Sequence, residues 1–189
     1  MKNATFVAVA VVSVFALAPA GLEAQNCWVA QGDAADRPSP LDSAVVSMGG
    51  ETVKVCFGAP SARGRTLVGG DIHPFGAPWR TGANEATSIH LPFPATVAGV
   101  AVTAGSYSLY TVPGADSWGI HLNSVVERWG IPITDEVTAN DIGSGMAPAS
   151  AADHVETMDM TFEDASADAA TLVLRWEGYR VDIPVARQN

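Results

Sequence analysis

Basic residues are scarce in this chain of 189 residues. Ten lysines and arginines stand against 20 aspartates and glutamates, so the formal net charge is −10 at pH 7. An acidic surface of this kind repels the phosphates of nucleic acids and of anionic lipids. The composition therefore predicts no nucleic-acid partner.

Long apolar runs are also missing after the N-terminus. The first residues combine a basic start at Lys2, an apolar run from Ala4 to Ala18 and small residues up to Ala24. This order is typical of a secretory signal peptide, and the run is too short for a stable membrane span. We predict a signal peptide over residues 1–24 and an exported protein, periplasmic or extracellular, that has no membrane span.

Only two cysteines are present, Cys27 and Cys56. In an oxidising compartment the favoured interpretation is a disulfide between them. Such a link stabilises a fold by about 3–4 kcal/mol in the chain-entropy model. A free thiol at Cys56 or a metal-ligand role is the alternative, although neither has a local cluster of partners.

Catalytic and metal-binding motifs are absent as well. The four histidines are scattered without metal-ligand spacing, the acidic residues lack the pattern of a calcium loop, and no G-x-S-x-G is present. We therefore expect no metal site and no cofactor, and the sequence favours a protein that is not an enzyme.

The chain does contain many short segments in which apolar and polar residues alternate. Residues 43–48 and 51–57 flank Gly49-Gly50, which predicts a hairpin with a tight turn. Similar segments follow at 87–91, 97–102, 105–112, 118–122, 158–162, 172–176 and 181–185. One-sided alternation is typical of antiparallel sheets with one face in water. We predict an all-β antiparallel sandwich, jelly-roll-like or immunoglobulin-like, with little helix, and keep a closed β-barrel as the alternative.

The order of these segments also predicts the domain organisation. Residues 25–41 resemble an extended N-terminal lead-in, and residues 42–187 a single β-sandwich domain. Residues 124–129 are expected to form one or two helical turns. The Ala-, Gly-, Ser- and Pro-rich residues 138–153 are expected to form a long loop, and Glu177-Gly178 a turn between two strands.

The segment from residue 61 to 85 differs from the rest in composition. It is rich in glycine and proline, and it carries three of the nine basic residues that remain once Lys2 is removed. Long loops of compact domains often carry function. The candidate ligand-binding residues are Arg63, Arg65, Trp79, Arg80, Thr81, Asn84 and Glu85, with Tyr107 from a nearby strand.

Two interpretations of this segment stay open. Arginines can fork onto a carboxylate or phosphate, and Trp79 can offer a stacking face. Alternatively, Arg80 and Glu85 pair internally, Trp79 belongs to the core, and the segment is scaffolding.

Three function classes follow. The first is a non-enzymatic ligand-binding or envelope-associated module that takes a small anionic or carbohydrate ligand. The second is a glycan- or ester-directed hydrolase with Glu85 as acid or base. The third is a structural subunit held by an exposed sheet edge. The oligomeric state is not predicted.

Several motifs resemble an exported bacterial family catalogued as domain of unknown function 2911. They are Pro60–Arg65, Trp79–Thr87, Gly105–Gly114 and Trp129-Gly130, and the resemblance spans about residues 42–186. Its most specific part is the run Trp-Arg-Thr-Gly-Ala-Asn-Glu-Ala-Thr. The family pattern has an aliphatic residue where His73 stands, and it lacks the two cysteines. The resemblance implies export and a compact β-rich domain, but no activity.

Overall fold

The computed structural model describes residues 26–30, 32, 34 and 36–188. The predicted signal peptide lies outside the described residues and stays a prediction, as does the assignment of a single domain to residues 42–187. Among the described residues, no helix is both long and apolar enough to cross a membrane.

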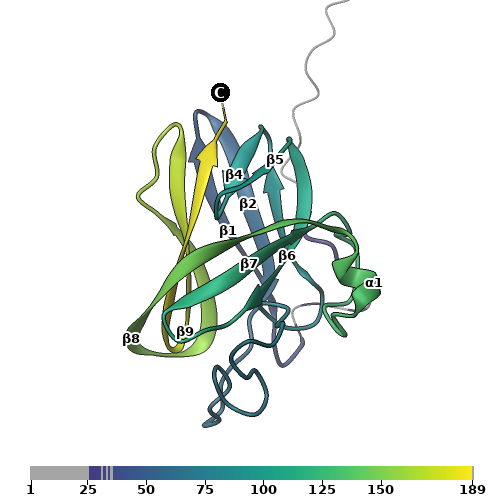
Figure 1. The fold of residues 1–189 in the computed structure, drawn as a ribbon, viewed down its shortest axis with the longest axis vertical. Helices are drawn as coiled ribbons and strands as arrows, with labels where there is room; N and C mark the ends of the chain where they lie inside the picture. The colour runs from purple at the N-terminus through teal and green to yellow at the C-terminus, as the bar shows by residue number, and fades with distance from the viewer. Residues whose placement is uncertain (1–25, 31, 33, 35, 189) are drawn as a thin grey trace, which may run out of the picture.

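Nine strands and one four-residue helix make up the fold of the described residues (Figure 1). The strands are β1 (Leu41–Met48), β2 (Glu51–Gly58), β3 (Thr87–Leu91), β4 (Ala95–Val97), β5 (Val100–Val102), β6 (Gly105–Val112), β7 (Ser117–Asn123), β8 (Asp141–Glu163) and β9 (Ala169–Arg187), and α1 is Asp135–Thr138. This confirms the all-β prediction with little helix.

The strands form one antiparallel sheet in the order β1-β2-β3-β6-β7-β8-β9-β4-β5. The long strand β8 belongs to both parts of this sheet: residues 141–148 pair with β7, and residues 149–163 pair with β9. The two parts share a single apolar core. The sheet is not closed on itself, so the barrel alternative is wrong.

Three tryptophans lie where the two parts of the sheet meet. Trp118 of β7 and Trp176 of β9 are fully buried, and Trp79 stacks on Trp176 with ring centroids 5.2 Å apart. Trp118 also contacts Tyr179 of β9 at a centroid separation of 6.1 Å. Burying large rings from both parts holds them together, because aromatic side chains bury the most apolar area per residue.

The N-terminal hairpin and the disulfide match the expectations. Met48 pairs with Glu51 across the Gly49-Gly50 turn, and both glycines have positive φ. The two cysteines form a disulfide, which joins the lead-in to β2.

Three local predictions are wrong. Most of residues 138–153 belong to β8, because small residues there alternate between the core and the outer face. Glu177-Gly178 does not separate two strands; β9 continues through it with a kink, where Glu177 has a φ of 50°. The helix forms at 135–138 rather than 124–129.

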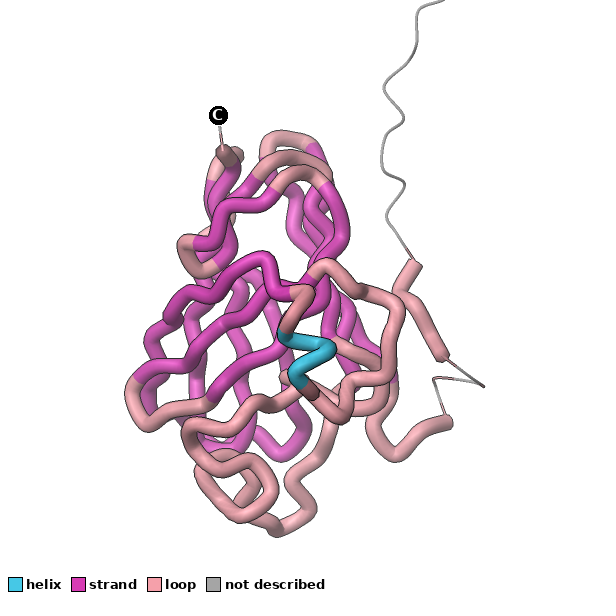
Figure 2. Tube along the Cα trace, turned by 45° about the vertical axis from the view of Figure 1, so that its right-hand side comes forward, coloured by secondary structure: helices cyan, strands magenta, loops and turns pink. Residues whose placement is uncertain are grey.

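The loops gather mainly at one end and on one side of the sheet (Figure 2). The longest connects β2 to β3 and hangs below the strands in Figure 1. It covers residues 59–86, is called the β2–β3 loop below, and contains all but one of the predicted ligand-binding residues.

Candidate functional site

The second half of the β2–β3 loop is fastened to the end of β6. The Trp79 N–H donates to the Thr111 carbonyl at 2.7 Å, and the Thr111 N–H donates back at 2.9 Å. Ala83 N–H also donates to Gly58 O at 3.1 Å. These bonds fix the loop backbone against two strands.

Trp79 belongs to the core and is only 2% exposed. One neighbour is Trp176, and Trp118 meets the ring edge-on at 5.8 Å. The imidazole of His73 lies 5.1 Å from the ring centroid. With these neighbours, Trp79 has no open face on which a ligand could stack.

Thr81 and Asn84 shape the loop from within. Both have positive φ, 59° and 63°. The fully buried Thr81 hydroxyl hydrogen-bonds with Trp79 O at 3.1 Å and with Thr111 Oγ1 at 3.0 Å. The Asn84 amide donates to the carbonyl of Ser39 in the lead-in at 2.9 Å. In this arrangement both side chains make internal contacts.

Glu85 is also engaged internally. Its carboxylate is 5% exposed and accepts hydrogen bonds from Arg37 Nη1 at 2.7 and 2.8 Å and from the Ala30 amide at 3.0 Å. Burial alone would raise the pKa of Glu85, but the bonds from Arg37 and Ala30 outweigh it and hold this pKa below its ordinary value. The sequence suggests Arg80 as the internal partner, whereas the partner in the structure is Arg37, 48 residues away.

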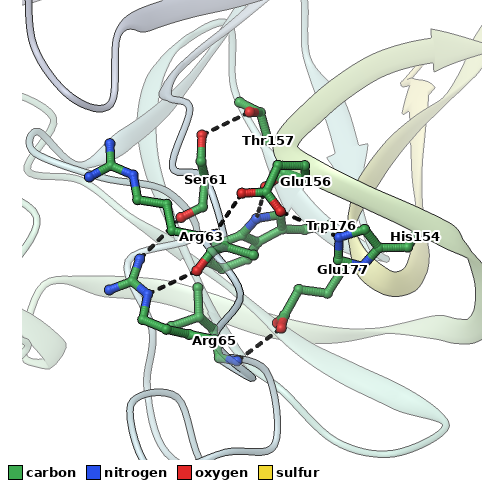
Figure 3. A network of polar contacts seen from close by, with 10 residues as sticks. Ser61, Arg63, Arg65, His154, Glu156, Thr157, Trp176 and Glu177 are labelled. Carbon is green, nitrogen blue, oxygen red and sulfur yellow. Dashed lines mark hydrogen bonds and ion pairs between the residues drawn. The ribbon is translucent and has the colours of Figure 1, made fainter.

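Arg63 and Arg65 lie at the exposed start of the loop (Figure 3). Arg63 donates from its backbone N–H to Glu156 at 2.6 Å and from Nη2 to Pro38 O at 2.9 Å. Arg65 donates from Nε to Ala62 O at 2.9 Å and from Nη2 to the Ser61 carbonyl at 3.1 Å.

Tyr107 does not join this group. Its hydroxyl donates to the Thr103 carbonyl oxygen at 2.9 Å. It lies four residues before Thr111 on β6, which places it about 13 Å from the point where the loop is fastened. The structure therefore does not bring this predicted site residue to the loop.

Glu177, which no sequence pattern indicates as a site residue, holds the middle of the loop by hydrogen bonds (Figure 3). Its carboxylate is 8% exposed and accepts the backbone N–H groups of Leu67 at 2.9 Å and Val68 at 2.7 Å. Its positive φ at the kink of β9 is the kind of strain that persists only where surrounding contacts fix it.

Like the exposed Arg63 and Arg65 of the same loop, Arg80 forms no ion pair among the described residues, but it is the one of these three arginines that is not exposed. Its Nε donates to Gly82 O at 3.1 Å. Its aliphatic stem packs so closely on Gly130 that a Cβ there would lie 2.5 Å from Arg80 Cδ. Within the described part of the chain, no carboxylate lies within ion-pairing distance of this guanidinium. The side chain is half-buried, and burial lowers the pKa of Arg80.

His73 is a partly buried residue of the same loop, close enough to Arg80 and Arg65 for their charges to act on it. Burial lowers the pKa of His73 to about 4; the positive charges of Arg80 and Arg65 lower it further, and the carboxylate of Glu177 opposes them. The imidazole is therefore neutral at pH 7 and can both donate and accept a hydrogen bond. Arg80, His73 and Arg65 form the group called the arginine–histidine site below.

A second polar cluster lies on the outer face of β6–β8. Asp141 accepts hydrogen bonds from the Tyr110 hydroxyl and from Asn123 Nδ2, the latter at 2.8 Å, and lies 3.4 Å from His121 Nδ1. Burial, together with the bond to Asp141, raises the pKa of Tyr110. This cluster shares no residue with the arginine–histidine site. Across the described residues, no group of three or more His, Cys, Asp or Glu could hold a metal ion.

Comparison with known proteins points to one family. No curated protein matches the chain. No solved structure matches it either. A family model described as "Protein of unknown function (DUF2911)" matches residues 39–185, which is most of the chain and agrees with the resemblance seen in the sequence. The chain therefore belongs to this family of proteins of unknown function.

Proposed function

We propose that this protein is a non-enzymatic module, exported or envelope-associated, that binds a small anionic ligand at the arginine–histidine site. The ligand class is a phosphate, a phosphate monoester or a small dicarboxylate. The observation that carries the proposal is the half-buried Arg80 guanidinium without a carboxylate partner among the described residues.

A desolvated cation without a partner destabilises the protein that contains it. In a chain with twice as many acidic as basic residues, a counter-ion would be easy to supply. Instead, Glu85 of the same loop is paired with Arg37. An external anion at Arg80 would offset the desolvation, and its attraction would be stronger than at a fully hydrated surface.

The neighbouring groups suit a ligand with two or more oxygens. The two terminal nitrogens of Arg80 have no hydrogen-bond partner in the described part of the chain. The fork of a guanidinium group matches the geometry of a carboxylate or a phosphate. Neutral His73 would add a donor or acceptor. Arg65 would add positive charge at the exposed rim.

A thermal-shift titration of the purified protein tests this proposal. Phosphate, sulfate and succinate would be compared with neutral sugars at constant ionic strength. A bound anion should raise the melting temperature with concentration, and stabilisation reaches about 2.7 kcal/mol at one hundred times Kd. Arg80→Met should abolish the shift.

Arg63→Met provides the matched control, since Arg63 is exposed and outside the site. It should keep the shift. Absence of a shift for every anion, or an equal loss in both variants, would overturn the proposal.

The hydrolase hypothesis receives less support. Both Glu85 oxygens accept hydrogen bonds from Arg37, and the lowered pKa suits neither a proton donor nor a base near pH 7. The structural-subunit hypothesis remains an alternative, and the anion titration separates it from the binding module.

A further inference from the structure

Where strand β8 pairs with β9, it contains four more residues than the matching part of β9. Between Ala151 and Val155 it advances four residues while β9 advances two, from Tyr179 to Glu177. The same excess recurs between Val155 and Asp159. Extra residues bow a strand out of its sheet, and such bulges are enriched beside functional sites.

The second bulge has a structural explanation. Met158 N–H donates to Pro60 O at 2.8 Å, and Ala62 N–H donates to Glu156 O at 2.8 Å. These bonds connect β8 to the start of the β2–β3 loop. The extra residues there join the two parts of the fold.

The first bulge, residues 152–154, has no such explanation. Its backbone forms no hydrogen bond with any loop in the described part of the chain. It borders an open hollow of about 730 Å³ on the surface of β8 and β9. The lining residues are Ala151, Ala152, Asp153, Val155, Arg175 and Arg180. Small-molecule binding sites commonly have volumes of about 300–1,000 Å³.

The two arginines of the hollow are held by acidic residues that do not line it. Glu163 accepts a hydrogen bond from each arginine, and Arg180 Nε lies 2.8 Å from an Asp182 oxygen. Arg175 Nη1 also donates to Thr161 Oγ1 at 3.1 Å. The guanidinium groups are therefore oriented before any ligand arrives.

This arrangement leaves a few polar groups of the lining residues without a partner among the described residues. Arg175 Nε and Arg180 Nη1 have no partner within the part of the chain that the structure describes, and neither has the Asp153 carboxylate. The charges of the two arginines are balanced by Glu163 and Asp182, so the hollow has no excess positive charge to attract an anion.

We infer that the hollow on β8–β9 is a second binding site, independent of the arginine–histidine site, for a neutral, hydroxyl-rich ligand such as an oligosaccharide. Oriented N–H donors beside a carboxylate acceptor match neighbouring sugar hydroxyls, which both accept and donate. The small side chains of Ala151 and Ala152 leave room for a sugar ring over the strand.

The test is a calorimetric and NMR titration of the full chain with neutral trisaccharides of glucose and of N-acetylglucosamine, and with a glucuronate trisaccharide. We expect a neutral trisaccharide to bind with an affinity that does not change between low and high salt, because no charge is neutralised. Binding by the glucuronate trisaccharide alone, weakened by salt, or no binding at all, would overturn the inference.

Two variants locate the site. Ala151→Tyr fills the hollow without touching the ion pairs, and Asp153→Ala removes the free acceptor; each should lower the affinity at least tenfold. Asp164→Asn in the turn after β8 is the matched control and should bind as the parent does. Unchanged binding in both hollow variants would overturn the inference, whatever the anion titration at Arg80 shows.

Discussion

Glu85 and Arg80 belong to one loop and lie five residues apart. The charge of Glu85 has a counter-ion, whereas the charge of Arg80 has none among the described residues. Glu85 is almost completely buried, and its oxygens accept hydrogen bonds from Arg37 and from a backbone amide. Arg80 is half-buried and has one bond to a carbonyl, with no carboxylate partner among the described residues. A buried charge with its partner stabilises a loop. A desolvated charge without one is what a ligand site requires.

The largest effect is expected when the ion pair between Glu85 and Arg37 is removed. Arg37→Met leaves the Glu85 carboxylate buried without its counter-ion, which should lower the free energy of unfolding by about 3–5 kcal/mol. Urea denaturation of the variant measures this loss. Adding Glu85→Met should recover much of it, since the lone charge is then removed. A loss below about 1 kcal/mol for Arg37→Met would contradict a structural role for the pair.

The next largest effect is expected at Glu177, which holds the middle of the β2–β3 loop. Glu177→Gln replaces a carboxylate that accepts two backbone amides with a side chain that has one acceptor oxygen. We expect a loss of about 1–3 kcal/mol. Hydrogen exchange at the Leu67 and Val68 amides should become faster. Unchanged exchange at both amides would show that this carboxylate does not hold the loop.

The third prediction uses pH to examine His73. Its pKa in the folded protein is about 4, below the ordinary value of 6.5, so the unfolded chain binds more protons between these values. The stability that neutral His73 contributes is complete above pH 6.5 and is lost as pH falls towards 4.

This loss should amount to about 1–3 kcal/mol, reduced by solvent because the ring is partly exposed. His73→Leu should flatten the decline between pH 6.5 and 4, while the decline below this range, where carboxylates such as Glu85 are protonated, should remain. An identical pH profile in the variant would contradict burial of the neutral imidazole.

The smallest effect on stability is expected at Arg80. Arg80→Met keeps the stem that packs on Gly130 and removes a desolvated charge together with one hydrogen bond. The two changes oppose each other, so the melting temperature should move by no more than about 4 °C, which corresponds to about 1 kcal/mol. Differential scanning calorimetry provides the measurement. A much larger fall would place Arg80 with Glu85 among the structural residues.

Local sequence patterns predicted most of the fold. Alternation and the glycine turn identified the β1–β2 hairpin, alternation identified the paired segments 158–162 and 172–176 of β8 and β9, and cysteine usage identified the disulfide. The first half of β8 was missed because its small residues have little β-propensity; pairing with β7 and the core overrides that preference.

The site could be predicted only in part, because its key contacts join residues far apart in the chain. Composition identified the β2–β3 loop, but it could not indicate that Glu85 pairs with Arg37 of the lead-in or that Glu177 reaches the Leu67 amide. Those contacts leave Arg80 without a carboxylate partner among the described residues. Tyr107 was predicted to lie near the loop from a neighbouring strand, yet its hydroxyl bonds to Thr103.

Isothermal titration of phosphate into the parent protein and into Arg80→Met, together with the melting temperature of both, tests the central claim most directly. The account predicts that the variant melts close to the parent and binds at least tenfold more weakly, a difference of about 1.4 kcal/mol or more. A variant that unfolds readily, or one that binds phosphate as well as the parent, would contradict it and identify the loop as scaffolding.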